Sequence, residues 1–113
     1  MPRWLIIAML LAGCASSGDR AIEREVDVLI GEPGAAADAA ESALVARGAD
    51  AILFLETGLW RASPHGRKRV IRTLESIGDP EALAIIEIMA ARDPDAEVRA
   101  RAEKARRAMT PTQ

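Results

Sequence analysis

The fold is decided by the stretch Arg67-Lys-Arg-Val70-Ile-Arg-Thr-Leu74-Glu-Ser-Ile77-Gly78-Asp79-Pro80. Its apolar residues recur three and four positions apart, which is the spacing of one face of an α-helix. Gly78 ends this helix, and Asp79 and Pro80 begin the next one as N-cap and first-turn residue. The stretch therefore predicts a helix over about 65–77, a tight turn and a second helix that follows at once.

Glycines and prolines that end or begin helices recur along the chain at a period of about thirty residues. Gly48 precedes Gly78 by 30 positions, and the prolines at 33, 64 and 94 are 31 and 30 positions apart. The predicted helices cover about 20–30, 35–47, 49–61, 65–77, a segment from Pro80 onward, and 95–108. They form three helix–turn–helix pairs, which is the signature of a solenoid whose hairpins bury their apolar faces on one another.

The composition also indicates an all-α protein. Hydrophobic residues make up 50% of the 113 residues and aromatic residues only 3%. Alanine supplies much of the apolar fraction, and it is the best helix former but a poor space-filler, so we expect a thin helical core. Phe54 and Trp60 are predicted to lie in that core, on the third helix.

These motifs resemble HEAT-like repeats, in particular the short variety named after phycobilisome lyases. Gly78-Asp79-Pro80 and Val98-Arg99 carry the resemblance, which is good over about 65–108 and weaker over 19–64. It implies a short right-handed α-solenoid of about three hairpins over residues 19–109, followed by a flexible tail at 110–113. Gly66-Arg67 departs from the family pattern, which has valine before the arginine.

The N-terminus has the pattern of an export signal. A positive start that includes Arg3 is followed by nine apolar residues, 4–12, which as a helix cover roughly 14 Å and cannot span a bilayer alone. The run ends in Leu11-Ala-Gly-Cys14, which resembles the lipobox of bacterial lipoproteins. An ordinary signal peptide, or a buried apolar helix with a chance cysteine, remains the alternative.

The lipobox resemblance implies how the chain is processed and where it resides. Residues 1–13 would be cleaved as a signal, Cys14 would carry a diacylglyceryl group and usually a further acyl chain such as palmitate, and 14–18 would form a short lipidated tether. Two or more acyl chains anchor a protein stably in a bilayer. Ala15 resembles the pattern of lipoproteins sent to the outer membrane, facing the periplasm, in hosts with two membranes.

Charge is segregated along the chain. Residues 15–60 hold nine acidic and three basic side chains, residues 61–72 hold five basic ones, residues 73–98 hold seven acidic ones against Arg92, and residues 99–113 hold five basic ones against Glu103. Both basic clusters fall on second helices of consecutive hairpins, which line the inner surface of a HEAT-like stack. We therefore predict a basic inner face that binds an acidic partner. Its residues are Arg67, Lys68, Arg69, Arg72, Arg99, Arg101 and Lys104.

A structural interpretation of the same charges stays open. Arg67 and Arg99 occupy the family's usual arginine position and could pair with aspartates such as Asp79 and Asp93 as intramolecular struts. The remaining charges would then form a solvated helix surface, which is the commoner role of charge runs on helices.

Catalysis, cofactors and metals are not predicted. His65 is the single histidine and lies in a turn, where capping or solvent exposure is expected, and the sequence offers no nucleophile in a recognisable motif. One histidine without a second soft ligand is not a metal site. The net charge of −2 does not favour nucleic acid as a partner.

The predicted function is a membrane-anchored, non-catalytic module that binds or scaffolds another envelope protein or an anionic partner. Two alternatives remain. One is an accessory factor of a lyase-like or other envelope enzyme system, and the other is a structural lipoprotein that associates with itself.

Overall fold

The computed structural model describes residues 3–31 and 34–110, with side chains from residue 17 onward, and this part of the chain is an all-α structure. Its elements, in chain order, are α1 (Arg3–Gly31), α2 (Gly34–Arg47), the 3-10 turn η1 (Gly48–Ala51), α3 (Ile52–Leu59), α4 (Pro64–Ile77), α5 (Pro80–Arg92) and α6 (Ala96–Met109). The predicted fold class, a short helical solenoid of about three hairpins, is confirmed.

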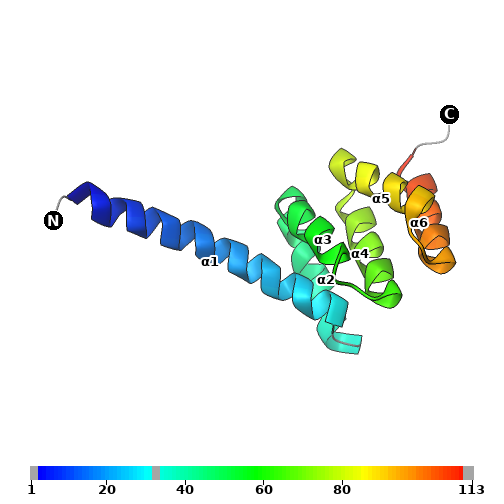
Figure 1. Cartoon of the computed structure of the whole chain (residues 1–113), viewed down its shortest axis with the longest axis horizontal. Coiled ribbons are helices and arrows are strands. Elements are labelled where there is room, and N and C mark those ends of the chain that lie inside the picture. Colours follow the sequence, from blue (N-terminus) through cyan, green and yellow to red (C-terminus); the bar gives the residue numbers. More distant parts are fainter. Residues whose placement is uncertain (1–2, 32–33, 111–113) are drawn as a thin grey trace.

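The helices form two rows. α2, α4 and α6 pack side by side in an inner row, while α1, α3 and α5 form the outer row, with α4 in contact with both (Figure 1). Each hairpin therefore contributes one helix to each row, so that the second helices of consecutive hairpins are neighbours as predicted.

Local capping explains where the helices begin and end. The Ser63 side chain accepts a hydrogen bond from the Gly66 N–H at 3.1 Å, and Pro64 occupies the first helical position of α4. Asp79 caps α5 in the same way by accepting from the Glu81 N–H at 2.9 Å. Gly78 ends α4 with φ of 72°, a left-handed conformation that costs glycine little.

One continuous apolar core runs through all three hairpins. Alanines in the last two helices let them approach closely, because their short side chains leave little separation between backbones. The buried core residues are Ile22, Val26, Leu29, Ala40, Leu44, Ala51, Ile52, Leu55, Val70, Ile71, Leu74, Ala82, Ile85, Ile86, Met89, Val98, Ala102 and Ala105.

The first helix is longer than predicted. α1 begins at Arg3 and continues without a break through residues 14–18, the segment expected to be a tether, and its N-terminal part projects away from the other helices (Figure 1). Removal of residues 1–13 as a signal stays a prediction. The Cys14 side chain lies outside the described side chains, as do residues 111–113 of the predicted tail.

The third predicted helix, 49–61, is divided and shorter. It starts as a 3-10 turn over 48–51, and the α-helical part ends at Leu59. The prediction that Trp60 belongs to the core is wrong, since Trp60 is 88% exposed. Ile52, Leu55 and Gly58 form the buried face of α3, and Trp60 follows on the opposite side. Phe54 is partly buried and packs against the core, as predicted.

Candidate functional site

A shallow hollow of about 360 Å³ lies on the inner row of helices. Four of the seven basic residues predicted for the inner face line it, three from α4 and one from α6. The lining residues are Gly34, Asp38, His65, Lys68, Arg69, Arg72 and Arg101. All four cations that line the hollow were therefore predicted from the sequence, but the lining residue Asp38 was not.

Ion pairs tie the cations of the hollow to acids of neighbouring repeats. Each of these pairs joins two helices of the inner row, with the acid one repeat before or after the base. The pairs are Lys68–Glu97 at 2.9 Å, Arg72–Glu41 at 2.6 Å and Arg101–Glu75 at 2.9 Å. Charge segregation along the chain thus serves, in part, to match adjacent helices across the stack.

The pairs differ in how firmly they hold the cations. The Glu97 side chain is 80% exposed, whereas the Arg101 and Glu75 side chains are each about one quarter exposed. Exposed ion pairs contribute about 0–1 kcal/mol, so Lys68 can exchange its carboxylate at little cost. Arg72 is similarly accessible at 48% exposure, although Asp38 at 3.7 Å adds a second acid beside it.

Arg69 contributes to the hollow and also braces the first hairpin. One of its Nη atoms donates to the Leu29 carbonyl near the end of α1 at 3.2 Å. Cations near a helix C-terminus interact favourably with its unpaired carbonyl groups. Arg69 therefore both lines the hollow and connects α4 to α1.

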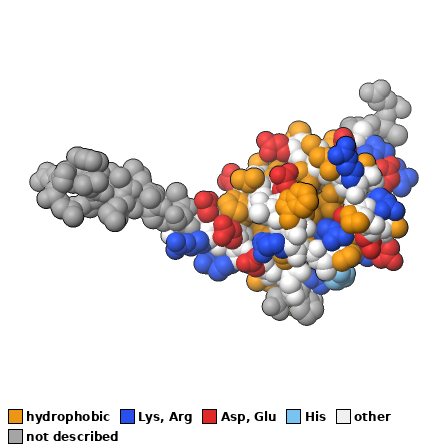
Figure 2. All heavy atoms as spheres, viewed as in Figure 1, with side chains coloured by type: hydrophobic (Ala, Val, Ile, Leu, Met, Phe, Trp, Pro, Cys, Tyr) orange, Lys and Arg blue, Asp and Glu red, His pale blue; other side chains and the backbone are white. Residues whose placement is uncertain are grey.

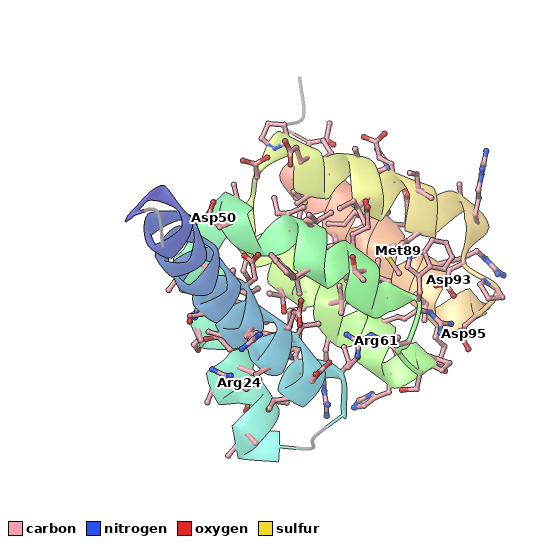
Figure 3. The ribbon with its side chains drawn as sticks, turned by 60° about the vertical axis from the view of Figure 1, so that its left-hand side comes forward. Arg24, Asp50, Arg61, Met89, Asp93 and Asp95 are labelled. Carbon is pink, nitrogen blue, oxygen red and sulfur yellow. The ribbon has the colours of Figure 1, made fainter. Side chains whose placement is uncertain are left out.

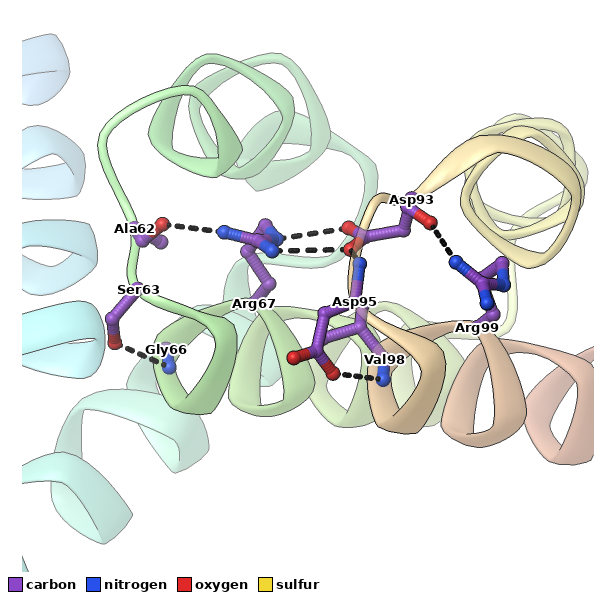
Figure 4. A network of polar contacts seen from close by, with 8 residues as sticks. All are labelled: Ala62, Ser63, Gly66, Arg67, Asp93, Asp95, Val98 and Arg99. Atoms are coloured by element: carbon purple, nitrogen blue, oxygen red, sulfur yellow. Dashed lines mark hydrogen bonds and ion pairs between the residues drawn. The ribbon is translucent and has the colours of Figure 1, made fainter.

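Arg67 and Arg99 lie elsewhere, in a network that joins two interhelical connections (Figure 4). The Arg67 guanidinium donates two hydrogen bonds to the Asp93 carboxylate, at 2.8 and 3.0 Å, and a third to the Ala62 carbonyl at 2.9 Å. Arg99 donates to the Asp93 backbone carbonyl at 2.7 Å. Figure 3 shows Asp93 and Asp95 close together, at the connection between α5 and α6.

The predicted struts are therefore present at Asp93 but not at Asp79. The Asp93 and Arg67 side chains are only 5% and 17% exposed, so this ion pair is largely buried. Asp79 instead caps α5, because its position directly before Pro80 places its oxygen at the free N–H groups of that helix.

The electrostatic balance at Asp93 favours its charged form. Burial by itself would raise the pKa of the Asp93 carboxyl, but hydrogen bonds from Arg67 and from the Asp95 N–H, together with the charges of Arg67 and Arg99, outweigh it. The pKa of Asp93 therefore lies below its ordinary value. Such a carboxylate is a structural anion rather than a proton donor at neutral pH.

The remaining predicted residues contribute less to the hollow. Lys104 is exposed on α6 and is not among the lining residues. His65 is exposed, as expected, and lines the hollow beside Lys68, while the cap of α4 is Ser63.

Two kinds of feature are absent from the described residues. No group of three or more His, Cys, Asp or Glu side chains is placed there to hold a metal ion. None of the helices in that part of the chain combines the length and hydropathy needed to cross a membrane.

The repeat architecture agrees with a comparison against protein families. A family model of HEAT repeats matches residues 7–106, which is most of the chain and extends from α1 into α6. The chain belongs to the HEAT-repeat family. Comparison with curated proteins and with solved structures finds no match. Stacked HEAT repeats create curved surfaces that commonly mediate protein–protein interaction, and the hollow lies on one such surface.

One signal in the sequence could have revealed the ion pairs. The acids that meet Arg72 and Lys68 are 31 and 29 positions away, close to one repeat length. In a HEAT-repeat stack, residues one repeat apart lie on adjacent helices of the same row. Opposite charges at that separation therefore predict pairs across the stack instead of a free basic surface.

Proposed function

We propose that the protein is a lipid-anchored, non-catalytic HEAT-repeat module of the cell envelope that binds an acidic segment of another envelope protein in its inner hollow. The observation that carries the proposal is the lining of the hollow. Four cations from two neighbouring repeats, Lys68, Arg69, Arg72 and Arg101, line it with a single carboxylate, Asp38.

The existing ion pairs leave the hollow available to such a partner. Glu97 is mostly in solvent, so it can move aside and let a partner carboxylate meet Lys68. Arg72 is half exposed and offers several donors in a planar group, which suits carboxylate binding. Arg67 does not bind the partner in this proposal, because it is held in a buried ion pair with Asp93. Breaking that pair would leave two charges unpaired and shielded from water.

The proposed anchor rests on the lipobox-like Leu11-Ala-Gly-Cys14. A lipidated Cys14 would begin the mature chain eight residues before Ile22, the first buried core residue of α1. That short distance would hold the hollow close to the bilayer, where its partner would also reside. An outer membrane, with the domain facing the periplasm, is favoured if the host has two membranes.

Binding in the hollow is tested with a glutamate-rich peptide and the full chain in nanodiscs of uncharged lipid. The double variant Lys68→Glu with Arg72→Glu should bind the peptide at least about tenfold more weakly than wild type. The matched control, Arg92→Glu with Arg107→Glu, alters net charge equally at exposed positions outside the hollow. Equal affinities of the two double variants would contradict the proposed site.

The anchor is tested separately by Cys14→Ser. The wild-type chain should incorporate an alkyne-labelled fatty acid and sediment with membranes, whereas the variant should incorporate none and lose its mature, membrane-bound form. An intact N-terminus with an unmodified thiol in the wild-type protein would overturn the anchor and leave the hollow as a separate question.

A further inference from the structure

The large apolar side chains that are exposed in the described chain all lie on the outer row. They are Leu53 (67% exposed) on α3, Trp60 (88%) directly after the end of α3, and Ile88 (59%) on α5. Figure 2 shows hydrophobic side chains, with acidic ones among them, over the part of the surface formed by these helices. Tryptophan is enriched at interaction sites, because its ring offers a large apolar surface and its N–H can still bond a partner.

Leu53 and Trp60 define what we call the outer strip. They are seven positions apart, two helical turns, and so lie on one side of α3, away from the buried Leu55. Ile88 is exposed on α5, the outer helix that contacts α3. This arrangement gives a binding helix or extended segment two apolar anchors about two turns apart.

A groove between α1 and α3 adjoins the strip at Leu53. It has a volume of about 420 Å³, and its apolar floor is formed by Leu53 and the partly buried Phe54. The other lining residues are Glu23, Asp27, Thr57 and Arg61. Asp27 and Arg61 form an ion pair at 2.7 Å, which crosses from α1 to the end of α3.

The charge around the strip is negative, opposite to the lining of the inner hollow. Glu23 lies in the groove, and Glu56 is exposed one turn after Leu53. With Asp27 there are three carboxylates against the one guanidinium of Arg61, a net charge of −2. We infer that the outer strip binds a cationic amphipathic segment of a partner protein, with apolar side chains on Leu53 and Trp60 and lysine or arginine beside Glu23 and Glu56.

Charge distinguishes this occupant from the other possibilities. A bilayer rich in anionic lipid would be repelled by the carboxylates that border the strip. The acidic segment proposed for the inner hollow would be repelled as well, so the two surfaces select different segments. The module could therefore hold two partners, or two parts of one partner, on opposite sides of the helical stack.

The inference is tested by measuring the binding of a helical leucine–lysine peptide that carries a photoreactive group. The full chain is held in phosphatidylcholine nanodiscs, and empty nanodiscs serve as the blank. Crosslinks should map to α1 and α3. The variant Glu23→Lys with Glu56→Lys should weaken binding about tenfold, and Leu53→Ser with Trp60→Ser should do the same. These residues are exposed, so the variants should fold, which circular dichroism verifies.

The matched control is Glu81→Lys with Glu97→Lys, which changes net charge equally at exposed sites outside the groove and should retain wild-type affinity. Equal loss in both charge-reversed variants, or wild-type affinity of the serine variant, would overturn the inference. So would labelling of α3 by photoreactive phosphatidylglycerol in anionic nanodiscs without peptide crosslinks there, since the strip would then be a membrane contact.

Discussion

At the scale of single residues, Asp93 links the second and third hairpins more firmly than any other described anion. It accepts two bonds from Arg67 and one from the Asp95 N–H, and its carbonyl accepts from Arg99. Asp93→Ala should lower the free energy of unfolding by about 3 kcal/mol, because Arg67 is left buried without its counter-ion. Urea denaturation followed by circular dichroism measures the loss.

The control for this prediction is Glu97→Ala. Glu97 also forms an interhelical ion pair, with Lys68, but its side chain is 80% exposed. Its removal should change the free energy of unfolding by no more than about 0.5 kcal/mol. Equal effects of the two substitutions would show that burial does not set the strength of these pairs.

Asp93 also makes stability depend on pH. Because its folded-state pKa is lowered, the stabilisation from its carboxylate is complete above the ordinary value of about 4 and is lost as pH falls through the folded-state pKa. Asp93→Asn should flatten the decline of stability below about pH 4, since an amide does not titrate. A wild-type slope in the variant would contradict this account.

At the scale of elements, α3 packs on α1 at a contact that only glycine permits. A Cβ atom added at Gly58 would lie 2.6 Å from Cγ1 of Val26, a side chain that is 1% exposed. Overpacking of this kind costs about 1–3 kcal/mol, more than the gain of about 1 kcal/mol from replacing a helical glycine by alanine. Gly58→Ala should therefore lower the free energy of unfolding, measured in urea.

A double-mutant cycle separates this contact from other effects. In a Val26→Ala background the clash is gone, so Gly58→Ala should become neutral or stabilising. Gly18→Ala is the control for helix propensity, since a Cβ there meets nothing within 4 Å, and it should stabilise the chain by up to about 1 kcal/mol. Additive effects of the Val26 and Gly58 substitutions would exclude the proposed close approach.

Sequence alone predicted those elements whose ends are set locally. Ser63 with Pro64, Asp79 with Pro80 and the left-handed Gly78 act on their own backbone, so both ends of α4 and the start of α5 followed from the pattern. The end of α3 and the exposure of Trp60 depend on how α3 lies against α1, and no local motif encodes that. The apolar spacing within 49–61 predicts a buried Trp60, and the side chain is instead 88% exposed.

The position of the candidate site could be predicted from the sequence, but the ion pairs formed by its cations could not. The repeat placed Lys68, Arg72 and Arg101 on adjacent helices of one row, and they do line one hollow. Which carboxylate each one meets depends on the register between helices, which a single sequence does not fix. The apolar outer strip was missed because Leu53 and Trp60 look like core residues until the neighbouring helices are in place.

At the scale of the whole molecule, the two rows of helices give the stack two chemically different sides. The inner hollow is lined mainly by cations, and the outer strip combines apolar side chains with carboxylates. Both depend on helices from more than one hairpin, since Arg101 of α6 completes the hollow and α1 forms one wall of the groove. Both proposed binding surfaces therefore require the complete array.

The array should unfold as one unit, because three hairpins are the minimum that buries a continuous core. The core cluster extends from Ile22 in α1 to Ala105 in α6, and α4 packs on both α5 and α6. A chain ending at residue 79 lacks α5 and α6, which pack on α4, and it lacks Asp93, the ion-pair partner of Arg67. It should show no cooperative urea transition and a large loss of helical circular dichroism, whereas a chain ending at Thr110 should unfold like wild type. A cooperative transition in the shorter chain, with a midpoint near that of wild type, would mean that the first two hairpins fold independently of the third.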